Sequence, residues 1–178
     1  MHRVGCVGGP RGLDMPFIDV GQKAPAWSLY DQDGVSHSLK DFAGKFLVLY
    51  FYPKDDTSVC TAQACSFRDA LPKFKRSQAV VLGISPDDQA SHTKFIKKHK
   101  LNFTLLADPK QDSDVPKVCN AYGVWAEKSM YGRKYMGVVR TTYLIGPDGK
   151  VLRRWDKVRV AGHADDVLDA VREAVMAQ

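Results

Sequence analysis

The sequence predicts an α/β fold in which helices flank a mixed central β-sheet. Two continuously apolar runs, KFLVLYFY at 45–52 and AVVLGIS at 79–85, are typical of strands buried on both faces. Segments with helical patterning, 60–76 and 85–99, follow these runs. Strands that alternate with helices indicate an α/β sandwich. The 178 residues, 44% hydrophobic and 26% charged, suffice for one domain with its own core.

The remaining elements follow in order along the chain. An N-terminal β-hairpin is expected over 26–39, and the first helix is expected to begin at Thr57 or Ser58, which are both good N-caps. The helix over 85–99 begins with acids and ends with basic residues, as the helix dipole favours. After it we expect a strand over 102–108, a helical turn that closes at Gly123, a β-hairpin over 140–156 and an amphipathic helix over 163–177. This order, βαβαβ followed by a hairpin and a helix, fits a thioredoxin-like arrangement.

Composition limits the domain organisation and the class of function. Residues 1–14 are expected to be a disordered N-terminal extension without the apolar core of a signal peptide, and 15–178 a single domain. The net charge is +6, but the basic residues are scattered, which argues against a nucleic-acid surface. No apolar run reaches membrane-spanning length. The four cysteines do not resemble a secreted disulfide framework, so we expect a reducing, cytoplasmic compartment in which a close thiol pair is catalytic or metal-binding.

Cys60 has a special position in the first predicted helix. At 100° per residue, one stripe must face the core, and it contains Cys60, Ala64, Phe67, Leu71 and Phe74. The thiol is therefore expected in the first helical turn, just beyond the carboxyl end of a core strand, where sites form in α/β sheets. Unpaired N–H groups at a helix N-terminus favour the thiolate, which is the nucleophilic form. The alternative is that Cys60 is only a small buried hydrophobe.

Cys65 lies about 140° around the same helix, toward its more polar side. Cα atoms five residues apart on a helix are separated by roughly 8–9 Å, whereas a disulfide needs less than about 7 Å. A bond between the two thiols would therefore require the first turns of the helix to unwind. Alternatively, Cys65 is an unrelated surface cysteine. The C-x-x-C pair of thioredoxin-type reductases is absent, and a zinc site would need ligands that the chain supplies only at Cys119 and scattered histidines.

These residues carry a resemblance to a known family. Pro53, Thr57 and Cys60 match the P-x-x-x-T-x-x-C signature of the peroxiredoxins. The wider text, including FYPKDDTSVCTAQACSFRD, FTLLAD, YGVW and YMGVVRTTYLIGPDGKV, resembles the peroxiredoxin Q or bacterioferritin-comigratory-protein subfamily from about residue 16 to the end. Several separated blocks agree in order, so the resemblance is specific.

The resemblance implies a set of roles at the site. Cys60 would be the peroxidatic cysteine, oxidised by peroxide to a sulfenic acid, and Cys65 the resolving cysteine that forms an intramolecular disulfide with it. Thr57 would hydrogen-bond the peroxide and the thiolate, and Pro53 would shield the sulfur from water. Arg140 matches the active-site arginine, a permanent cation suited to stabilising the thiolate and the leaving oxygen. Each of the last three has a plain alternative: an N-cap for Thr57, a strand terminator for Pro53 and a surface ion pair for Arg140.

The chain departs from the subfamily at Ser58, where proline is usual, so the loop before Cys60 is expected to be freer. Cys119 is interpreted as a buried core thiol, with a backup resolving role as the alternative, and Cys6 as incidental. The histidines show no ligand spacing, and no metal or cofactor is expected. The resemblance implies a monomeric peroxidase with hydrogen peroxide and organic hydroperoxides as substrates and a thioredoxin-like reductant. The alternatives are a peroxide sensor that relays oxidation to a partner protein, and a holdase chaperone.

Overall fold

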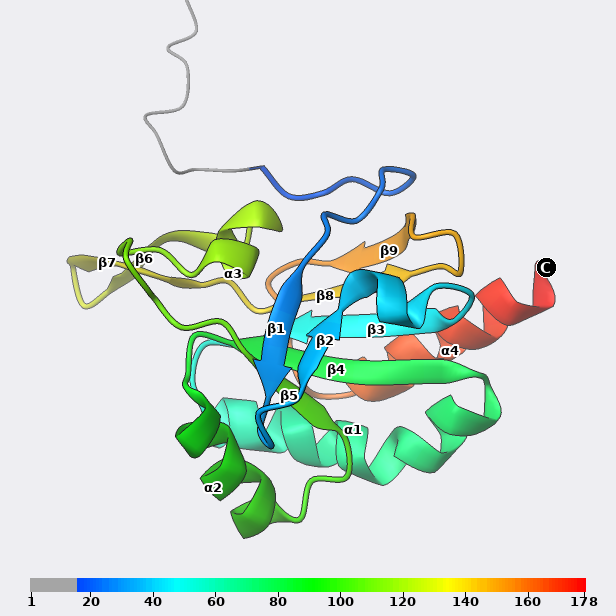
Figure 1. The fold of residues 1–178 in the computed structure, drawn as a ribbon, viewed down its shortest axis with the longest axis horizontal. Coiled ribbons are helices and arrows are strands. Elements are labelled where there is room, and N and C mark those ends of the chain that lie inside the picture. Colours follow the sequence, from blue (N-terminus) through cyan, green and yellow to red (C-terminus); the bar gives the residue numbers. More distant parts are fainter. Residues whose placement is uncertain (1–15) are drawn as a thin grey trace, which may run out of the picture.

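The computed structural model describes residues 16–178, so the predicted extension 1–14 and Cys6 lie outside the described residues. Within them, a seven-stranded sheet has the order β2-β1-β5-β4-β3-β8-β9, and a separate two-stranded sheet pairs β6 with β7 (Figure 1). The strands are β1 (Ser28–Asp31), β2 (Ser36–Ser38), β3 (Phe46–Phe51), β4 (Ala79–Ser85), β5 (Thr104–Ala107), β6 (Trp125–Met130), β7 (Arg133–Val138), β8 (Thr141–Ile145) and β9 (Val151–Trp155). The helices are the 3-10 turn η1 (Leu39–Phe42) and α1 (Ser58–Arg76), α2 (Gln89–His99), α3 (Lys117–Ala121) and α4 (His163–Met176).

The predicted mixed sheet is confirmed. β3 pairs with β4 and β4 with β5 in parallel, whereas β8 joins β3 antiparallel and β9 joins β8 antiparallel. All six residues of β3 are buried, as its continuous apolar sequence predicts for a central strand. The predicted N-terminal hairpin is also present, since β1 pairs antiparallel with β2 and with β5.

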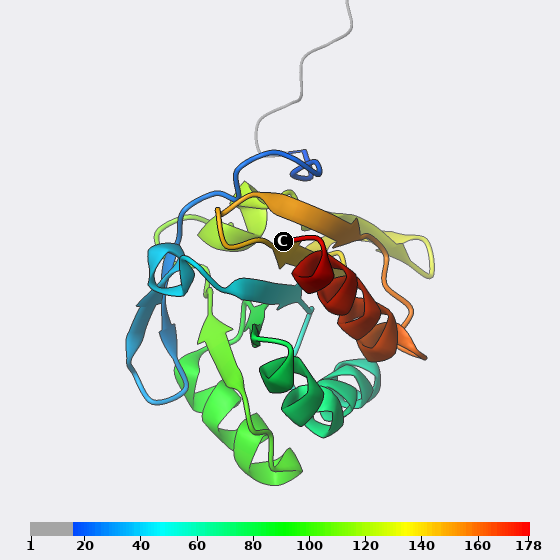
Figure 2. The same ribbon diagram turned by 90° about the vertical axis from the view of Figure 1, so that its right-hand side faces the viewer.

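Helices cover the large sheet unequally on its two faces (Figures 1 and 2). The alternate β3 residues Phe46, Val48 and Tyr50 belong to a core cluster with the buried faces of α1 and α4 and with Phe95 of α2. The other β3 residues, among them Leu49, pack in a second cluster with α3 and the chain around 118–125. The period of two along a strand therefore supplies two cores, one on each face of the sheet.

The first helix confirms the periodicity of its sequence. All five members of the predicted stripe, from Cys60 to Phe74, are buried in α1. Phe67 packs this face of α1 against the sheet, because its ring stacks on Tyr50 of β3 with ring centroids 4.8 Å apart. Pro72 lies inside α1, yet the helix continues to Arg76. The N-cap is Thr57, as expected, but its side chain makes no capping hydrogen bond.

Two elements were not predicted. The β6–β7 hairpin departs from the large sheet, and η1 follows β2 directly. Most β6 and β7 side chains are exposed or only partly buried, so their sequence lacks the apolar alternation that marks a half-buried strand. The tight turn of this hairpin has Tyr131 and Gly132 both at positive φ, a type I′ geometry that right-handed strand twist favours.

Candidate active site

Cys60 lies where the sequence predicts it, in the first turn of α1. The loop 52–57 leads from the end of β3 into the helix, and the helix then turns the Cys60 side chain inward. Only 2% of the residue is exposed, although its neighbour Val59 is 52% exposed. The thiol is therefore withdrawn from solvent beside free N–H groups of a helix N-terminus, which favour a negative charge.

Arg140 reaches this sulfur from the other side of the site. The residue directly precedes β8, which pairs with β3, so the sheet register brings Arg140 to the end of β3 where α1 begins. One guanidinium nitrogen of Arg140 donates to the Cys60 Sγ at 3.1 Å. A second guanidinium nitrogen donates to the Oε1 of Gln63 at 2.5 Å. The planar fork of an arginine allows both bonds at once, which fixes the cation against the sulfur.

Gln63 is a site residue that the sequence reasoning missed. It lies three residues after Cys60 in α1 and is fully buried. Its Oε1 accepts from Arg140, while its Nε2 is buried without a hydrogen-bond partner among the described residues. The signal was present in the sequence, because a long polar side chain one turn from Cys60 falls on the inward face of the helix.

Cys65 is on the same helix and is partly exposed, as predicted from its angular position. Both Cys60 and Cys65 are free thiols, and α1 is continuous from Ser58. The helix therefore separates the two sulfurs in this state, because Cα atoms five residues apart on a helix are too distant for a disulfide.

Thr57 and Pro53 belong to the loop before Cys60. The hydroxyl of the exposed Thr57 donates to the Lys54 carbonyl oxygen at 2.9 Å, and among residues 16–178 it makes no hydrogen bond to Cys60. Pro53 is half-buried at the end of β3. Ser58 is exposed and is the first residue of α1, and nothing in the structure explains its replacement of the usual proline.

Lys128 adds a second cation near the site. It extends from β6, and its Nζ donates to the carbonyl oxygen of Val138, two residues before Arg140. Burial lowers the pKa of Lys128, and the positive charge of Arg140 lowers it further, whereas Cys60 acts in the opposite direction. The β6–β7 hairpin thus places a half-buried lysine within electrostatic range of the thiol.

Cys119 is remote from this chemistry. It is fully buried in α3, and its backbone N–H donates to a carboxylate oxygen of Asp108 at 2.7 Å. Burial raises the pKa of the Cys119 thiol well above its usual range, and the neighbouring Asp108 raises it further. The thiol is therefore held in its protonated form, which is a poor nucleophile.

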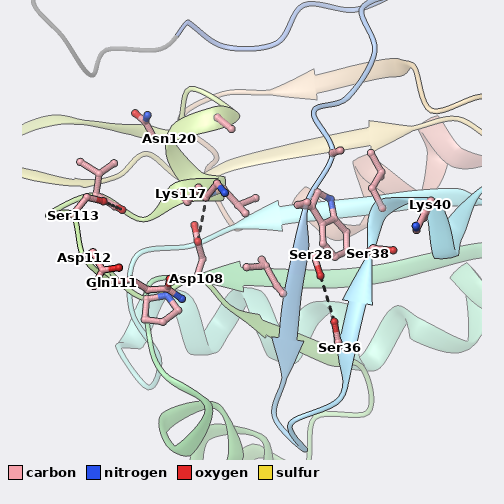
Figure 3. Close-up of a pocket in the computed structure, with 18 of the residues that line it drawn as sticks. Ser28, Ser36, Ser38, Lys40, Asp108, Gln111, Asp112, Ser113, Lys117 and Asn120 are labelled. Carbon is pink, nitrogen blue, oxygen red and sulfur yellow. Dashed lines mark hydrogen bonds between the residues drawn. The ribbon is translucent and has the colours of Figure 1, made fainter.

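A separate pocket lies between the β1–β2 hairpin and the chain around α3 (Figure 3). It has a volume of about 1240 Å³, and Ser28, Ser38 and Lys40 face Asp108 and Lys117 across it. None of the predicted site residues lines this pocket. Residues 16–178 bring together no group of three or more His, Cys, Asp or Glu side chains that could hold a metal ion. No helix in the same range has the length and apolarity needed to cross a membrane.

Comparisons with known proteins agree with this geometry. The AhpC/TSA family matches residues 20–154. The chain is 43% identical to peroxiredoxin Bcp of Bacillus subtilis over 156 residues, which cover 88% of this chain and 96% of the relative. It is 42% identical to peroxiredoxin Bcp of Escherichia coli, covering 88% and 97%.

Solved structures give the same result. The bacterioferritin comigratory protein of Xanthomonas campestris superposes with a TM-score of 0.79 at 38% identity, over 88% of this chain and 99% of that one. A cysteine-to-serine mutant of Xylella fastidiosa PrxQ superposes with a TM-score of 0.81 at 34% identity, over 90% and 99%. The fold is therefore the thioredoxin-like fold of these peroxiredoxins, and the chain belongs to the AhpC/TSA family as a peroxiredoxin of the Bcp and PrxQ group.

Proposed function

We propose that this chain is a thiol peroxidase that reduces hydroperoxides at Cys60. The observation that carries the proposal is the 3.1 Å contact between the Arg140 guanidinium and the Cys60 sulfur at the N-terminus of α1. A fixed cation and free N–H groups stabilise the thiolate, which is the form that attacks an O–O bond. The relative from Xanthomonas campestris is described as having alkyl peroxide reduction activity, which supports organic hydroperoxides among the substrates.

The first step oxidises Cys60. Its thiolate attacks one peroxide oxygen, an S–O bond forms as the O–O bond breaks, and the leaving oxygen takes a proton to depart as water or an alcohol. Negative charge grows on the leaving oxygen, and Arg140 is placed to stabilise it because the same guanidinium already contacts the sulfur. Thr57 and Pro53 lie in the adjoining loop, where we assign them contact with the peroxide and exclusion of water.

The second step uses Cys65. Its thiol attacks the sulfur of the Cys60 sulfenic acid, an S–S bond forms and water leaves. Because the wound helix holds the two residues apart, the first turns of α1 must unwind before the bond can form. A dithiol reductant then supplies two electrons by thiol exchange and restores both thiols. Family membership supports a thiol reductant in general, and we assign a thioredoxin-like protein to this role.

The expected biological form follows from the same resemblance. We infer that residues 15–178 act as a monomeric domain in the cytoplasm, where a reducing environment keeps Cys60 and Cys65 reduced between turnovers. Gel filtration with light scattering at micromolar concentrations tests the monomer. A mass of twice 19.8 kDa would contradict it.

The test of the function is a pair of cysteine variants. Cys60→Ser is expected to abolish peroxide consumption, whereas Cys65→Ser is expected to complete one round and then stop because the disulfide cannot form. Cys119→Ser is the matched control and is expected to turn over like the wild type. Turnover of Cys65→Ser with thioredoxin at the wild-type rate would contradict the resolving role. Slow recycling together with a mixed disulfide to one cellular protein would favour a peroxide sensor.

A further inference from the structure

The loop that carries the chain into Cys60 contains a buried acid. Asp55 lies five residues before Cys60, and only 7% of it is exposed. A carboxylate in such a place is costly unless charged or hydrogen-bonded partners compensate for the lost water. Its neighbours in the loop, Lys54 and Asp56, are both exposed, so the burial is specific to Asp55.

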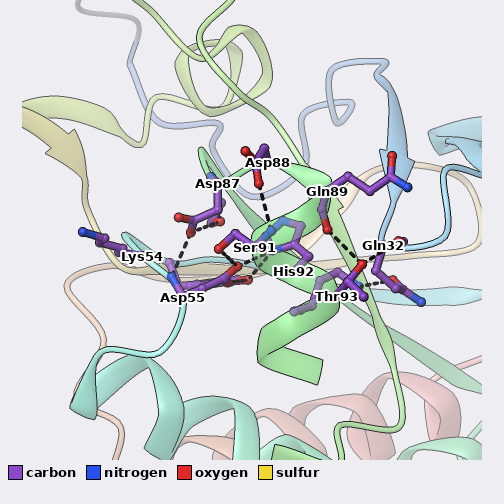
Figure 4. A network of polar contacts seen from close by, with 12 residues as sticks. Gln32, Lys54, Asp55, Asp87, Asp88, Gln89, Ser91, His92 and Thr93 are labelled. Carbon is purple, nitrogen blue, oxygen red and sulfur yellow. Dashed lines mark hydrogen bonds and ion pairs between the residues drawn. The ribbon is translucent and has the colours of Figure 1, made fainter. Parts of the chain in front are cut away.

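Three side chains compensate the Asp55 carboxylate, and a fourth contact holds its backbone. The hydroxyl of Tyr52 donates to one carboxylate oxygen at 2.6 Å. The other oxygen accepts from the Ser91 hydroxyl at 2.8 Å and lies 2.7 Å from the Nδ1 of His92. The backbone N–H of Asp55 donates to the Asp87 carboxylate at 2.8 Å. Figure 4 shows Ser91 and His92 of α2 directed toward Asp55, so the first turn of α2 holds the loop in front of α1.

His92 connects Asp55 to the sheet. Its ring is fully buried, and its Nε2 lies 3.0 Å from the backbone carbonyl oxygen of Leu106 in β5. A carbonyl oxygen only accepts, so Nε2 carries a hydrogen. The Nδ1–carboxyl contact then contains one further proton, on His92 or on Asp55, and is a hydrogen bond in either case. The ring therefore bridges a backbone atom of β5 and the loop.

The next loop residue is held differently. Asp56 has a left-handed backbone, with φ of 59°. Its carboxylate pairs with Lys98 at 2.7 Å and with His99 at 2.8 Å, near the other end of α2, and the Asp56 side chain is 43% exposed. Exposed ion pairs contribute little to folding stability, whereas removing one partner of a buried pair is strongly destabilising. The firm attachment of the loop is therefore at Asp55, and the chain becomes easier to move from Asp56 onward.

We propose that His92 is a positioning residue for Cys60, acting through Asp55, and that this buried pair marks the N-terminal limit of the segment that unwinds. The proposal rests on the proposed function, because it concerns the same thiol. The pair holds the chain before α1 against α2 and β5, which favours the wound helix with Cys60 at Arg140. Neither His92 nor Asp55 hydrogen-bonds the reacting sulfur among the contacts of the described residues.

The two steps of the reaction depend on this attachment in different ways. Oxidation of Cys60 requires the wound helix, so a loosened loop lowers the fraction of reactive protein. Disulfide formation requires the unwound segment. Five residues span up to roughly 17 Å when extended, so Cys60 can reach Cys65 while Asp55 stays bound. Loss of the His92–Asp55 bond is therefore expected to slow the first step without slowing the second.

Two variants of His92 separate its two hydrogen bonds. The amide nitrogen of asparagine takes the place of Nδ1, so His92→Asn keeps the bond to Asp55 and loses the one to Leu106. Glutamine extends as far as Nε2, so His92→Gln keeps the bond to Leu106 and loses the one to Asp55. Both place a neutral amide in the same buried position, and asparagine, one methylene shorter, leaves the larger void, so a general loss of core packing would affect His92→Asn at least as much as His92→Gln. Thr93→Ala is the control on α2, because Thr93 is exposed and, among residues 16–178, its hydroxyl donates only to the backbone carbonyls of Gln32 and Gln89.

The experiment measures the two steps separately in the full chain with hydrogen peroxide. Quenched-flow alkylation and mass spectrometry give the rate of Cys60 oxidation in a Cys65→Ser background, and the rate of disulfide formation with Cys65 present. We expect His92→Gln to slow Cys60 oxidation roughly tenfold, in the range that misplacement of a reacting group produces. His92→Asn is expected to stay within about threefold of wild type, Thr93→Ala to match it, and no variant to slow disulfide formation.

Several outcomes would overturn the proposal. Oxidation of Cys60 in His92→Gln at the wild-type rate, or an equal loss in His92→Asn and His92→Gln, would show that the bond to Asp55 does not position the thiol. If neither variant folds, Ser91→Ala removes one Asp55 bond nearer the surface and is expected to slow oxidation about twofold to threefold; an unchanged rate there overturns the proposal. A wild-type Cys60 that peroxide fails to oxidise would instead overturn the proposed function.

Discussion

The guanidinium of Arg140 lies 3.1 Å from the sulfur of Cys60, although the two residues are 80 positions apart in the sequence. The contact exists because β8 pairs antiparallel with β3, so Arg140 before β8 meets the chain that leaves β3 for α1. One sheet register thus brings a permanent cation to a thiol at a helix N-terminus. Both the charge and the orientation of Arg140 at the sulfur therefore depend on this arrangement.

Arg140→Lys is expected to slow Cys60 oxidation about 100-fold, as removal of one preorganised charge-stabilising donor typically does. Lysine keeps the charge, but its single ammonium cannot bond Gln63 and Cys60 with the planar fork of arginine. Stopped-flow measurement at limiting peroxide gives the rate. Arg153→Lys, at an exposed arginine over the Trp155 ring, is the control and is expected to match wild type. A loss of less than threefold in Arg140→Lys would count against the assigned role.

Gln63→Met is expected to slow the same step about tenfold, because the methionine side chain has a similar volume but offers Arg140 no oxygen acceptor. The guanidinium then loses its 2.5 Å hydrogen bond and its fixed orientation at the sulfur. Gln63→Glu keeps an oxygen at the same place and is expected to retain more of the rate than Gln63→Met. Equal rates for the two variants, with equal unfolding midpoints, would show that Gln63 only fills space.

His163 is expected to make folding stability depend on pH. Burial lowers its pKa to about 4 from an ordinary value of 6.5, and the ring lies beside Phe67 with its Nε2 2.8 Å from the Thr142 hydroxyl. Below pH 6.5 the unfolded chain binds a proton that the folded chain excludes. The contribution of the neutral ring is therefore complete above about pH 6.5 and declines as the pH falls toward 4.

Urea unfolding between pH 7.5 and 4 tests this dependence. The wild type is expected to lose on the order of 2–3 kcal/mol more than His163→Gln over this range, since each unit of pKa difference corresponds to about 1.4 kcal/mol. Glutamine keeps a polar atom near Thr142 but does not titrate, so it serves as the matched reference. Parallel losses in the two proteins would show that His163 stays accessible to protons in the folded state.

Local patterns in the sequence predicted much of the fold. The apolar runs of β3 and β4 and the buried stripe of α1 follow from periodicity alone, since a strand buried on both faces and an amphipathic helix each have a distinct pattern. The β6–β7 hairpin escaped prediction because its side chains largely face water, so burial imposes no pattern on them. A helix start at Thr57 or Ser58 was predicted and α1 begins at Ser58, but the hydrogen bond of the Thr57 hydroxyl to Lys54 was not predicted.

The site was only partly predictable from the sequence, because some of its contacts join residues that are far apart along the chain. Cys60 and Cys65 were found from their places on the predicted helix, and the family resemblance supplied their roles and Arg140. The structure places Cys60 and Arg140 together. Gln63 was missed although its position on the inward face of α1 was a usable signal. The contact between Asp55 and His92 joins residues 37 positions apart, and no local pattern indicates which buried acid will meet which histidine. Such contacts depend on how β3, β4 and α2 pack.

Oxidation is expected to join Cys60 and Cys65 in a disulfide, although a wound helix separates them in the reduced protein. The most direct measurement is peptide mapping by mass spectrometry after one equivalent of hydrogen peroxide, with the remaining free thiols alkylated. We expect a Cys60–Cys65 linked peptide and an unoxidised Cys119 that is alkylated once the protein is unfolded, because the buried Cys119 thiol is held in its protonated form, which is a poor nucleophile. A Cys60–Cys119 link, or Cys60 oxidised alone while Cys65 is recovered alkylated, would contradict the resolving role of Cys65.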